Sequence, residues 1–277
     1  MLNHLKEPNG GRSMNKRSVL RTVFITAVLA MLMSISVWAS KEGVQLKFNT
    51  DISVEATDNT MLHKLVLNRD GMVTILGLKV VKYTYSPTSY SGMYFTLLNS
   101  GKRAISSSTY VNSLPANKKY SYYAARFALK KGTYYVQVDG TKQYLLKAGF
   151  SAVNDQGKPK KKKGTSLKRG KTLSALFGAG ESIKKVEWFK IKVKKNRKLH
   201  LTANSYGDAT FRIYLYGPKP YKKGDIGTSL YSDDGWTVTY GIQRGLSRKL
   251  RKLKKGTYYV KVVRTNKDSG YCTLKWK

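Results

Sequence analysis

The sequence has 277 residues, of which 52 are Lys or Arg and only 15 are Asp or Glu, so its formal net charge is +37. A charge this large favours partners that are anionic polymers or surfaces. The single cysteine excludes an intramolecular disulfide framework, and 20 Tyr with only 6 Pro argue against a disordered chain.

The first 39 residues are predicted to be an upstream extension and a signal peptide. A basic segment that begins at Met14 precedes an apolar run over residues 22–39, which ends in a Val-x-Ala cleavage pattern at Val37 and Ala39. A retained membrane anchor is the alternative, because about 18 apolar residues can just span a bilayer. Ser34 and Ser36 favour cleavage, which would leave 47 basic and 14 acidic residues and no membrane span. We therefore expect a secreted protein, either extracellular or associated with a cell surface.

One motif of ten residues occurs twice. Residues 129–138, with the sequence Leu-Lys-Lys-Gly-Thr-Tyr-Tyr-Val-Gln-Val, recur at residues 253–262 with a single difference. A weaker pair lies upstream, where residues 63–67 resemble residues 189–193. The two offsets, 124 and 126, predict two modules of almost equal length.

The repeated segments have the pattern of β-strands. In residues 189–193 apolar and charged side chains alternate, which indicates a half-buried strand. A polar turn follows, and the alternation resumes at residues 198–201, so the pattern predicts a hairpin. In the shared motif, Gly132 or Gly256 is predicted to make the turn. Tyr258, Val260 and Val262 should then face one side of the strand, and Tyr259 and Lys261 the other.

The mature chain shows no amphipathic helical stripe, so the predicted fold class is all-β. We expect two tandem antiparallel β-sandwich domains, jelly-roll-like, over residues 43–153 and 166–277. The first is the more divergent. Residues 154–165 are polar, basic and rich in helix and strand breakers, and they predict a solvated linker.

The second module resembles the bacterial pre-peptidase C-terminal domain. The resemblance is carried by Glu187-Trp188-Phe189-Lys190-Ile191, Leu199-His200-Leu201, Gly256-Thr257-Tyr258-Tyr259-Val260 and Gly270-Tyr271-Cys272-Thr273-Leu274. Residues 43–150 match less well, since His63-Lys64-Leu65 replaces the entry strand. The resemblance implies a jelly-roll-like sandwich that accompanies exported enzymes without being catalytic. Some members of that family bind collagen or polysaccharide, sometimes with calcium.

The sequence offers no catalytic constellation. His63 and His200 lie at non-equivalent positions of the repeat, and Cys272 lies in a strand pattern, where a packed thiol is favoured over a nucleophile. His200 is expected to point outward. A hydrolase would require the fold to bring His63 or His200 beside an acid.

No cofactor is expected. Asp233 and Asp234 could supply two oxygens to calcium, and Asp208 or Asp225 could approach them, but a solvated turn is the favoured interpretation.

The basic residues form the strongest functional signal, because lysines that merely protect strand edges do not explain so large an imbalance. The residues predicted to contact an anionic polymer lie in the linker and in the second module: Lys160, Lys161, Lys162, Lys163, Lys168, Arg169, Arg248, Lys249, Arg251 and Lys252.

Aromatic residues offer a second mode of binding. Tyr231 and Trp236 lie in a loop rich in Gly and Ser and are the predicted ligand contacts there. Tyr214 and Tyr216 alternate with apolar residues, and we expect them in the sandwich core.

The leading hypothesis is a non-catalytic adhesion protein that contacts an anionic extracellular polymer, a glycan or the cell envelope. The alternative is a carbohydrate- or protein-binding accessory module of a secreted hydrolase system, with a separate partner enzyme.

Overall fold

The computed structural model describes residues 44–79, 93–111, 124–196, 199, 201–217, 229–230, 238–240, 243–244, 247–250 and 254–277. The predicted signal peptide lies outside these ranges. Within them, no helix is long and apolar enough to cross a membrane. Residues 36–277 form one compact unit.

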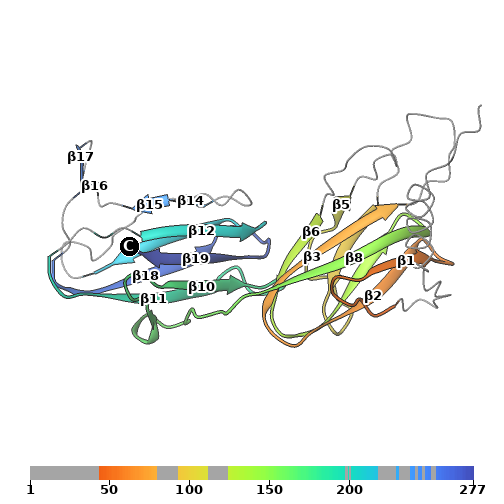
Figure 1. The fold of residues 1–277 in the computed structure, drawn as a ribbon, viewed down its shortest axis with the longest axis horizontal. Coiled ribbons are helices and arrows are strands. Elements are labelled where there is room, and N and C mark those ends of the chain that lie inside the picture. Colours follow the sequence, from red (N-terminus) through yellow and green to blue (C-terminus); the bar gives the residue numbers. More distant parts are fainter. Residues whose placement is uncertain are drawn as a thin grey trace, which may run out of the picture. The chain divides into compact units, whose positions relative to one another are not determined.

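The first half of this unit is a sandwich of two sheets (Figure 1). Its strands are β1 (Asp51–Glu55), β2 (Thr60–Leu67), β3 (Gly71–Lys79), β4 (Met93–Leu98), β5 (Thr109–Val111), β6 (Ala124–Leu129), β7 (Gly132–Asp139) and β8 (Gln143–Ala152). One sheet has the order β1-β8-β3-β6 and the other the order β2-β7-β4-β5. All pairings within these two sheets are antiparallel.

The second half repeats this arrangement. Its elements are η1 (Lys161–Lys163), β9 (Thr165–Ser166), β10 (Thr172–Phe177), β11 (Val186–Val193), β12 (Leu201–Gly207), β13 (Phe211–Tyr216), β14 (Ser229–Leu230), β15 (Val238–Tyr240), β16 (Gln243–Arg244), β17 (Ser247–Leu250), β18 (Gly256–Arg264) and β19 (Gly270–Trp276). The sheets have the orders β10-β19-β12-β15 and β14-β13-β18-β11-β9, and β16 pairs with β17 in a separate ribbon. These sheets confirm the predicted all-β class with antiparallel sandwiches.

Alternation of side chains builds a separate core in each sandwich. Phe189, Ile191 and Val193 of β11 are fully buried, as are Tyr258 and Val260 of β18. They pack in one apolar cluster of the second sandwich, and the first sandwich has its own cluster, which shares no residue with it. The prediction that Tyr258, Val260 and Val262 share one side of the strand is confirmed, and that side faces the core.

The predicted hairpin between residues 189–193 and 198–201 is wrong. β11 pairs with β18 and β9, whereas β12 pairs with β19 and β15, so the turn crosses from one sheet to the other. Both strands bury alternate side chains in the same core, a pattern that a hairpin and a sheet-to-sheet crossing share.

The repeated motif adopts the same conformation in both copies. Gly132 and Gly256 each have a φ of 158°, at the start of β7 and of β18. The Tyr134 hydroxyl donates to the Lys130 carbonyl at 3.0 Å, and the Tyr258 hydroxyl donates to the Lys254 carbonyl at the same distance. The motif thus fixes the entry into the central strand of one sheet in each sandwich.

The two sandwiches contact each other through a small buried cluster and a polar network. Met72 and Ala128 of the first sandwich pack with Leu176 of the second. The Ala128 amide donates to the Ser269 hydroxyl at 3.0 Å, and the Ala128 carbonyl accepts from the Ala179 amide at 2.9 Å.

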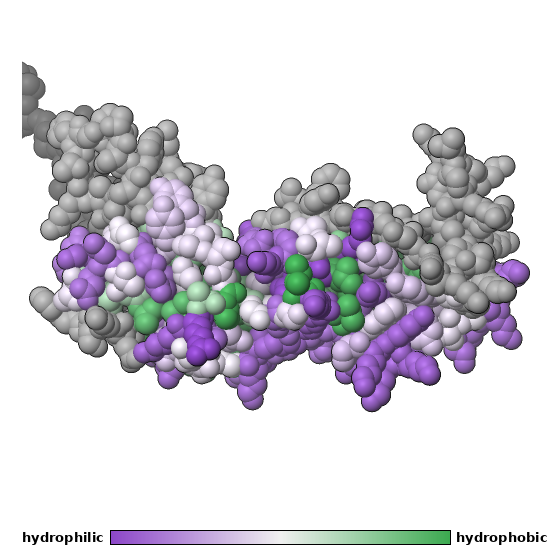
Figure 2. Space-filling view, turned by 180° about the vertical axis from the view of Figure 1, so that it is seen from behind, coloured by the Kyte–Doolittle hydropathy of each residue, from purple (hydrophilic) through white to green (hydrophobic). Residues whose placement is uncertain are grey.

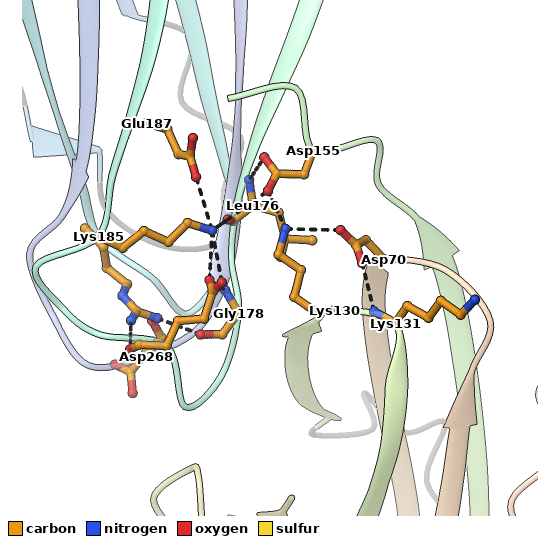
Figure 3. A network of polar contacts seen from close by, with 11 residues as sticks. Asp70, Lys130, Lys131, Asp155, Leu176, Gly178, Lys185, Glu187 and Asp268 are labelled. Atoms are coloured by element: carbon orange, nitrogen blue, oxygen red, sulfur yellow. Dashed lines mark hydrogen bonds and ion pairs between the residues drawn. The ribbon is translucent and has the colours of Figure 1, made fainter. Parts of the chain in front are cut away.

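The polar network gathers carboxylates around two lysines (Figure 3). Lys130 forms ion pairs with Asp70, at 3.1 Å, and with Asp155. Lys185 pairs with Glu181 at 3.0 Å and with the buried Glu187 at 3.2 Å. Burial raises the pKa of Glu187. Four carboxylates are therefore paired with lysines in this network.

Candidate functional site

The outer face of strands β11, β18 and β13 combines aromatic and basic side chains. Because strand residues alternate, burial of Phe189 and Ile191 turns their neighbours outward. The outward residues that concern us are Trp188 and Lys190 on β11, Tyr259 and Lys261 on β18, and Tyr214 and Tyr216 on β13, all of them half-buried. We call these six residues the aromatic–lysine face.

Strand register places these residues in two rows. Lys261 lies between Trp188 and Tyr214, because it pairs with Trp188 on one side and with Tyr214 on the other. In the next row Tyr259 lies between Lys190 and Tyr216. The prediction that Tyr259 and Lys261 lie on the side opposite Tyr258 is confirmed, and the prediction that Tyr214 and Tyr216 lie in the core is wrong. The alternation on β13 is real, but its buried members are the intervening Phe211, Ile213 and Leu215.

The segment predicted as a solvated linker lies along the edge of this sheet. The Trp188 amide donates to the Lys158 carbonyl at 2.8 Å, and β9 runs parallel to β11 beside Phe189 and Lys190. Gly164 lies so close to the Phe189 backbone that a Cβ there would be 3.1 Å from the carbonyl carbon. The lysine side chains of this segment are exposed, as expected, but its backbone is paired with the sheet.

This edge contact brings Lys161 over the aromatic rings. Its ammonium nitrogen lies 4.8 Å from the Tyr216 ring centre, 5.1 Å from that of Tyr259 and 5.8 Å from that of Trp188. The ammonium of Lys261 lies 5.9 Å from the Trp188 ring and 5.7 Å from the Tyr214 ring. All five separations are within the range of cation–π attraction. The rings therefore hold two ammonium groups on one face of the sheet.

No acidic residue weakens the field of these lysines from within the face. The outward positions of β11, β13 and β18 carry only aromatic, basic, Thr and Val residues. Glu187, the one acid on these strands, points inward to Lys185. Figure 2 shows hydrophilic side chains, in purple, projecting from the second sandwich, with paler residues between them. At the described outward positions of these three strands every charged side chain is cationic, so the face attracts anions.

The predicted site residues fall into three groups. Lys160, Lys161, Lys162 and Lys163 are exposed at η1, and Lys161 reaches the rings. Lys168 and Arg169 are exposed before β10, where Arg169 pairs with Trp276 rather than with this face. Arg248 and Lys249 lie on β17, and Arg251, Lys252, Tyr231 and Trp236 lie outside the described residues.

Sequence reasoning missed Trp188, Tyr259 and Lys261 as members of the site. The available signal was the alternation itself, since each is an aromatic or basic residue at an outward position of a predicted strand. What the pattern could not supply was the pairing of β11 and β13 with opposite sides of β18, which gathers residues from distant parts of the chain.

Two of the candidate catalytic residues, His63 and Cys272, are buried. His63 is fully buried, with its Nε2 2.6 Å from the Tyr144 hydroxyl, and burial lowers the pKa of His63 to about 4. Burial raises the pKa of the Cys272 thiol to about 12. His200 is outside the described residues, and so are Asp225, Asp233 and Asp234. Within the described ranges, no three His, Cys, Asp or Glu side chains are grouped so as to hold a metal.

The solved structures named below share less than 10% sequence identity with this chain. No family model matches the chain, and no curated protein matches it either. Among solved structures, a tandem CBM22 domain of Paenibacillus barcinonensis Xyn10C has 9% identity and a TM-score of 0.24, over 78% of this chain and 75% of that one. The CUB1-EGF-CUB2 domain of human MASP-1/3 has 5% identity and a TM-score of 0.21, over 82% and 99%. The ANX1 ectodomain from Arabidopsis thaliana has 8% identity and a TM-score of 0.21, over 84% and 90%. Values this low support no statement about function.

Proposed function

We propose that this protein is a secreted, non-catalytic binding protein that attaches to an anionic extracellular polymer or to the cell envelope. The contact surface is the aromatic–lysine face of the second sandwich together with the exposed lysines of η1. The observation that carries the proposal is the placement of the Lys161 and Lys261 ammonium groups over four aromatic rings.

Ring contacts make these two lysines better anion ligands than lysines that move freely. Immobilising a long side chain on binding costs about 0.5–1.5 kcal/mol. Lys161 and Lys261 are already restrained by the rings, so part of that cost is met during folding. The neighbouring Lys162 and Lys163 have the same charge and are exposed, but no ring contact is found for them among the described residues. They contribute only long-range attraction.

Charge separation within the fold supports the same function. The carboxylates of Asp70, Asp155, Glu181 and Glu187 are paired with lysines in the network between the sandwiches. The chain has 52 basic and 15 acidic residues. Four of these acids are held by only two lysines in the network, so most of the basic residues remain without an acidic partner there.

The test is retention of the mature chain on immobilised heparin, polygalacturonate and cell-wall polymer across a salt series. We expect retention to fall steeply as salt rises, because counterions screen exposed charges within about 3 Å at 1 M. Retention that is undiminished at about 1 M salt would refute an electrostatic contact.

A matched pair of variants separates the organised site from diffuse charge. Lys161→Met and Lys162→Met remove the same charge from the same turn, but only Lys161 contacts the rings. We expect Lys161→Met to weaken binding about fivefold more than Lys162→Met, on the scale of an exposed cation–π contact. If the two variants lose the same amount of binding, then net charge determines binding and the aromatic–lysine face does not.

We further propose that both sandwiches are of the pre-peptidase C-terminal type and that residues 1–39 direct export. The first proposal is supported by the repeated motif and the second by the basic and apolar pattern of that segment. Mass spectrometry of the secreted chain tests the second, with an N-terminus at residue 40 as the expected result.

A further inference from the structure

A pair of exposed tyrosines lies on the corresponding face of the first sandwich. Tyr94 on β4 and Tyr110 on β5 are direct partners across the two strands, and they are 44% and 43% exposed. Their ring centres are 5.0 Å apart, with the planes inclined at 53°. Among the described residues no cation lies over either ring, in contrast to the rings of the aromatic–lysine face. The tyrosine pair therefore presents open aromatic surface to solvent.

Beside the tyrosine pair lies a carboxylate held in a fixed orientation. Asp139 on β7 is the direct partner of Tyr94 on one side and of Thr60 on the other. The Thr60 hydroxyl donates to Oδ1 of Asp139 at 2.7 Å, and the Gln137 amide donates to Oδ2 at 2.8 Å and to Oδ1 at 3.1 Å. A carboxylate has about four acceptor sites, so Asp139 can accept a further hydrogen bond while its orientation is set by the protein.

Among the described residues of this face, the strand neighbours of Tyr94 and Asp139 are neutral. Thr60, Tyr94 and Tyr110 share one row with Asp139, and Leu62, Gln137 and Thr96 form the next row. The nearest lysines of this face belong to a third row, where Lys64 is paired with Tyr135 and Lys102 lies over its ring. In these two described rows Asp139 carries the only charge, and it is negative in a strongly basic protein.

We propose that the tyrosine pair and Asp139 form a binding site for a neutral, hydroxyl-rich sugar. A pyranose ring offers an apolar face to Tyr94 and Tyr110 and hydroxyl donors to the Asp139 carboxylate, as ligand sites combine aromatic surface with a few fixed polar groups. An acidic glycan is disfavoured, because its carboxylate or sulfate would meet Asp139. This site is separate from the proposed anion-binding face. It selects neutral ligands over acidic ones, whereas that face selects acidic ligands.

Salt separates the two sites experimentally. Stacking and hydrogen bonding to a neutral ligand are little affected by counterions, whereas the attachment to anionic polymers is screened. Failure of the sugar site would leave the anion-binding proposal untouched, and failure of anion binding would not affect the sugar site.

The experiment is a calorimetric titration of the mature chain in about 1 M NaCl with dextran, galactomannan and hydroxyethyl cellulose, and with alginate as the acidic comparison. We expect binding of at least one neutral polymer and no binding of alginate. Tyr94→Ala and Tyr110→Ala should each weaken that binding about tenfold, on the scale of a lost aromatic contact. Asp139→Asn should weaken it less, because an amide oxygen still accepts.

The control is Tyr206→Ala. Tyr206 is 38% exposed on the second sandwich and stacks on Tyr271, with ring centres 4.5 Å apart, so it matches the tyrosine pair in exposure and chemistry. Its partner on the neighbouring strand β19 is Tyr271, whereas the partner of Tyr94 on β7 is the carboxylate Asp139. Its substitution should leave neutral-sugar binding unchanged. The inference is overturned if no neutral polymer binds, if Tyr206→Ala weakens binding as much as Tyr94→Ala, or if Tyr94→Ala reduces binding of alginate instead.

Discussion

The two sandwiches share strand order and the ten-residue motif, yet their corresponding faces differ in chemistry. Register aligns Trp188, Lys261 and Tyr214 of the second sandwich with Leu62, Gln137 and Thr96 of the first. The next row aligns Val263 and Arg212 with Asp139 and Tyr94. Outward positions of a strand do not contribute to the core, so the fold tolerates either set. The duplicated scaffold thus carries two different surfaces.

The cores differ as well, and one difference concerns the polar pair of His63 and Tyr144. His63 corresponds to Phe189, since both lie opposite a buried Val of the motif strand. Tyr144 corresponds to Cys272, since their partners Lys79 and Ser205 are equivalent residues of β3 and β12. A hydrogen-bonded polar pair in the first sandwich is therefore replaced by an apolar pair in the second. The first sandwich alone should be sensitive to acid through this pair.

The largest expected effect is the loss of stability of the first sandwich in acid. Burial lowers the pKa of His63 from its ordinary value of 6.5 to about 4 in the folded protein, so the unfolded chain binds the proton first as pH falls. The full contribution of His63 to the free energy of unfolding is present above pH 6.5. The free energy of unfolding then decreases by about 3 kcal/mol as the pH approaches 4. The measurement is hydrogen exchange between pH 7 and 4, which compares the protection of the β2 amides in the first sandwich with that of the β11 amides in the second.

His63→Phe combined with Tyr144→Phe is the control for that prediction. It removes the titrating group without leaving an unpaired hydroxyl, as Phe189 does in the second sandwich. If the double variant is as sensitive to acid as the parent over this range, the carboxylates and not His63 are responsible.

Tyr144→Phe alone should destabilise the first sandwich by about 2 kcal/mol. It leaves His63 Nε2 buried without its partner at 2.6 Å, and an unsatisfied buried polar group costs about 1–3 kcal/mol. Urea unfolding measures the change. Tyr134→Phe, which removes a hydroxyl that is only half-buried, should cost less, and the reverse order would contradict this interpretation.

Trp188→Leu gives the aromatic–lysine face the residue type that the first sandwich has at the equivalent position, Leu62, and it leaves the charge unchanged. Both Lys161 and Lys261 lose a ring contact, and each contact is worth about 0.5–1 kcal/mol at an exposed site. Binding to heparin should weaken about tenfold at low salt. Leu62→Ala at the corresponding position of the first sandwich should leave heparin binding unchanged. If both substitutions weaken heparin binding equally, the two faces do not differ in this function.

Asp70→Asn is expected to have the smallest effect. Asp70 accepts from the Lys131 amide at 2.8 Å, and the equivalent Asn196 accepts from the Lys255 amide at 3.0 Å, so the substitution keeps this bond. It removes one of the two ion pairs of Lys130, and the ion pair with Asp155 remains. The Lys130 side chain is 34% exposed. We expect a loss below about 1 kcal/mol in thermal unfolding. A larger loss would show that the contact between the sandwiches depends on Asp70.

Local sequence was enough to predict the fold class, the two opposite faces of the motif strand and the exposure of the lysines in residues 160–163. These follow from alternation, from the repeat and from charge, none of which requires knowledge of distant contacts. Phe189 and Val260 alternate along their strands with charged residues such as Lys190 and Lys261, and the charged residues mark the side that faces solvent.

Strand pairing, by contrast, depended on contacts between distant parts of the chain. Alternation is the same for a hairpin and for a crossing between sheets, so β11 and β12 were wrongly predicted to pair. The same ambiguity placed Tyr214 and Tyr216 in the core, because an alternating strand has two faces and either set of residues on β13 could be buried. The backbone pairing of Lys158 with Trp188 made a predicted linker into part of the site. Lys161 meets its rings only because the edge of β11 holds that segment there, and such a contact has no signature in local sequence.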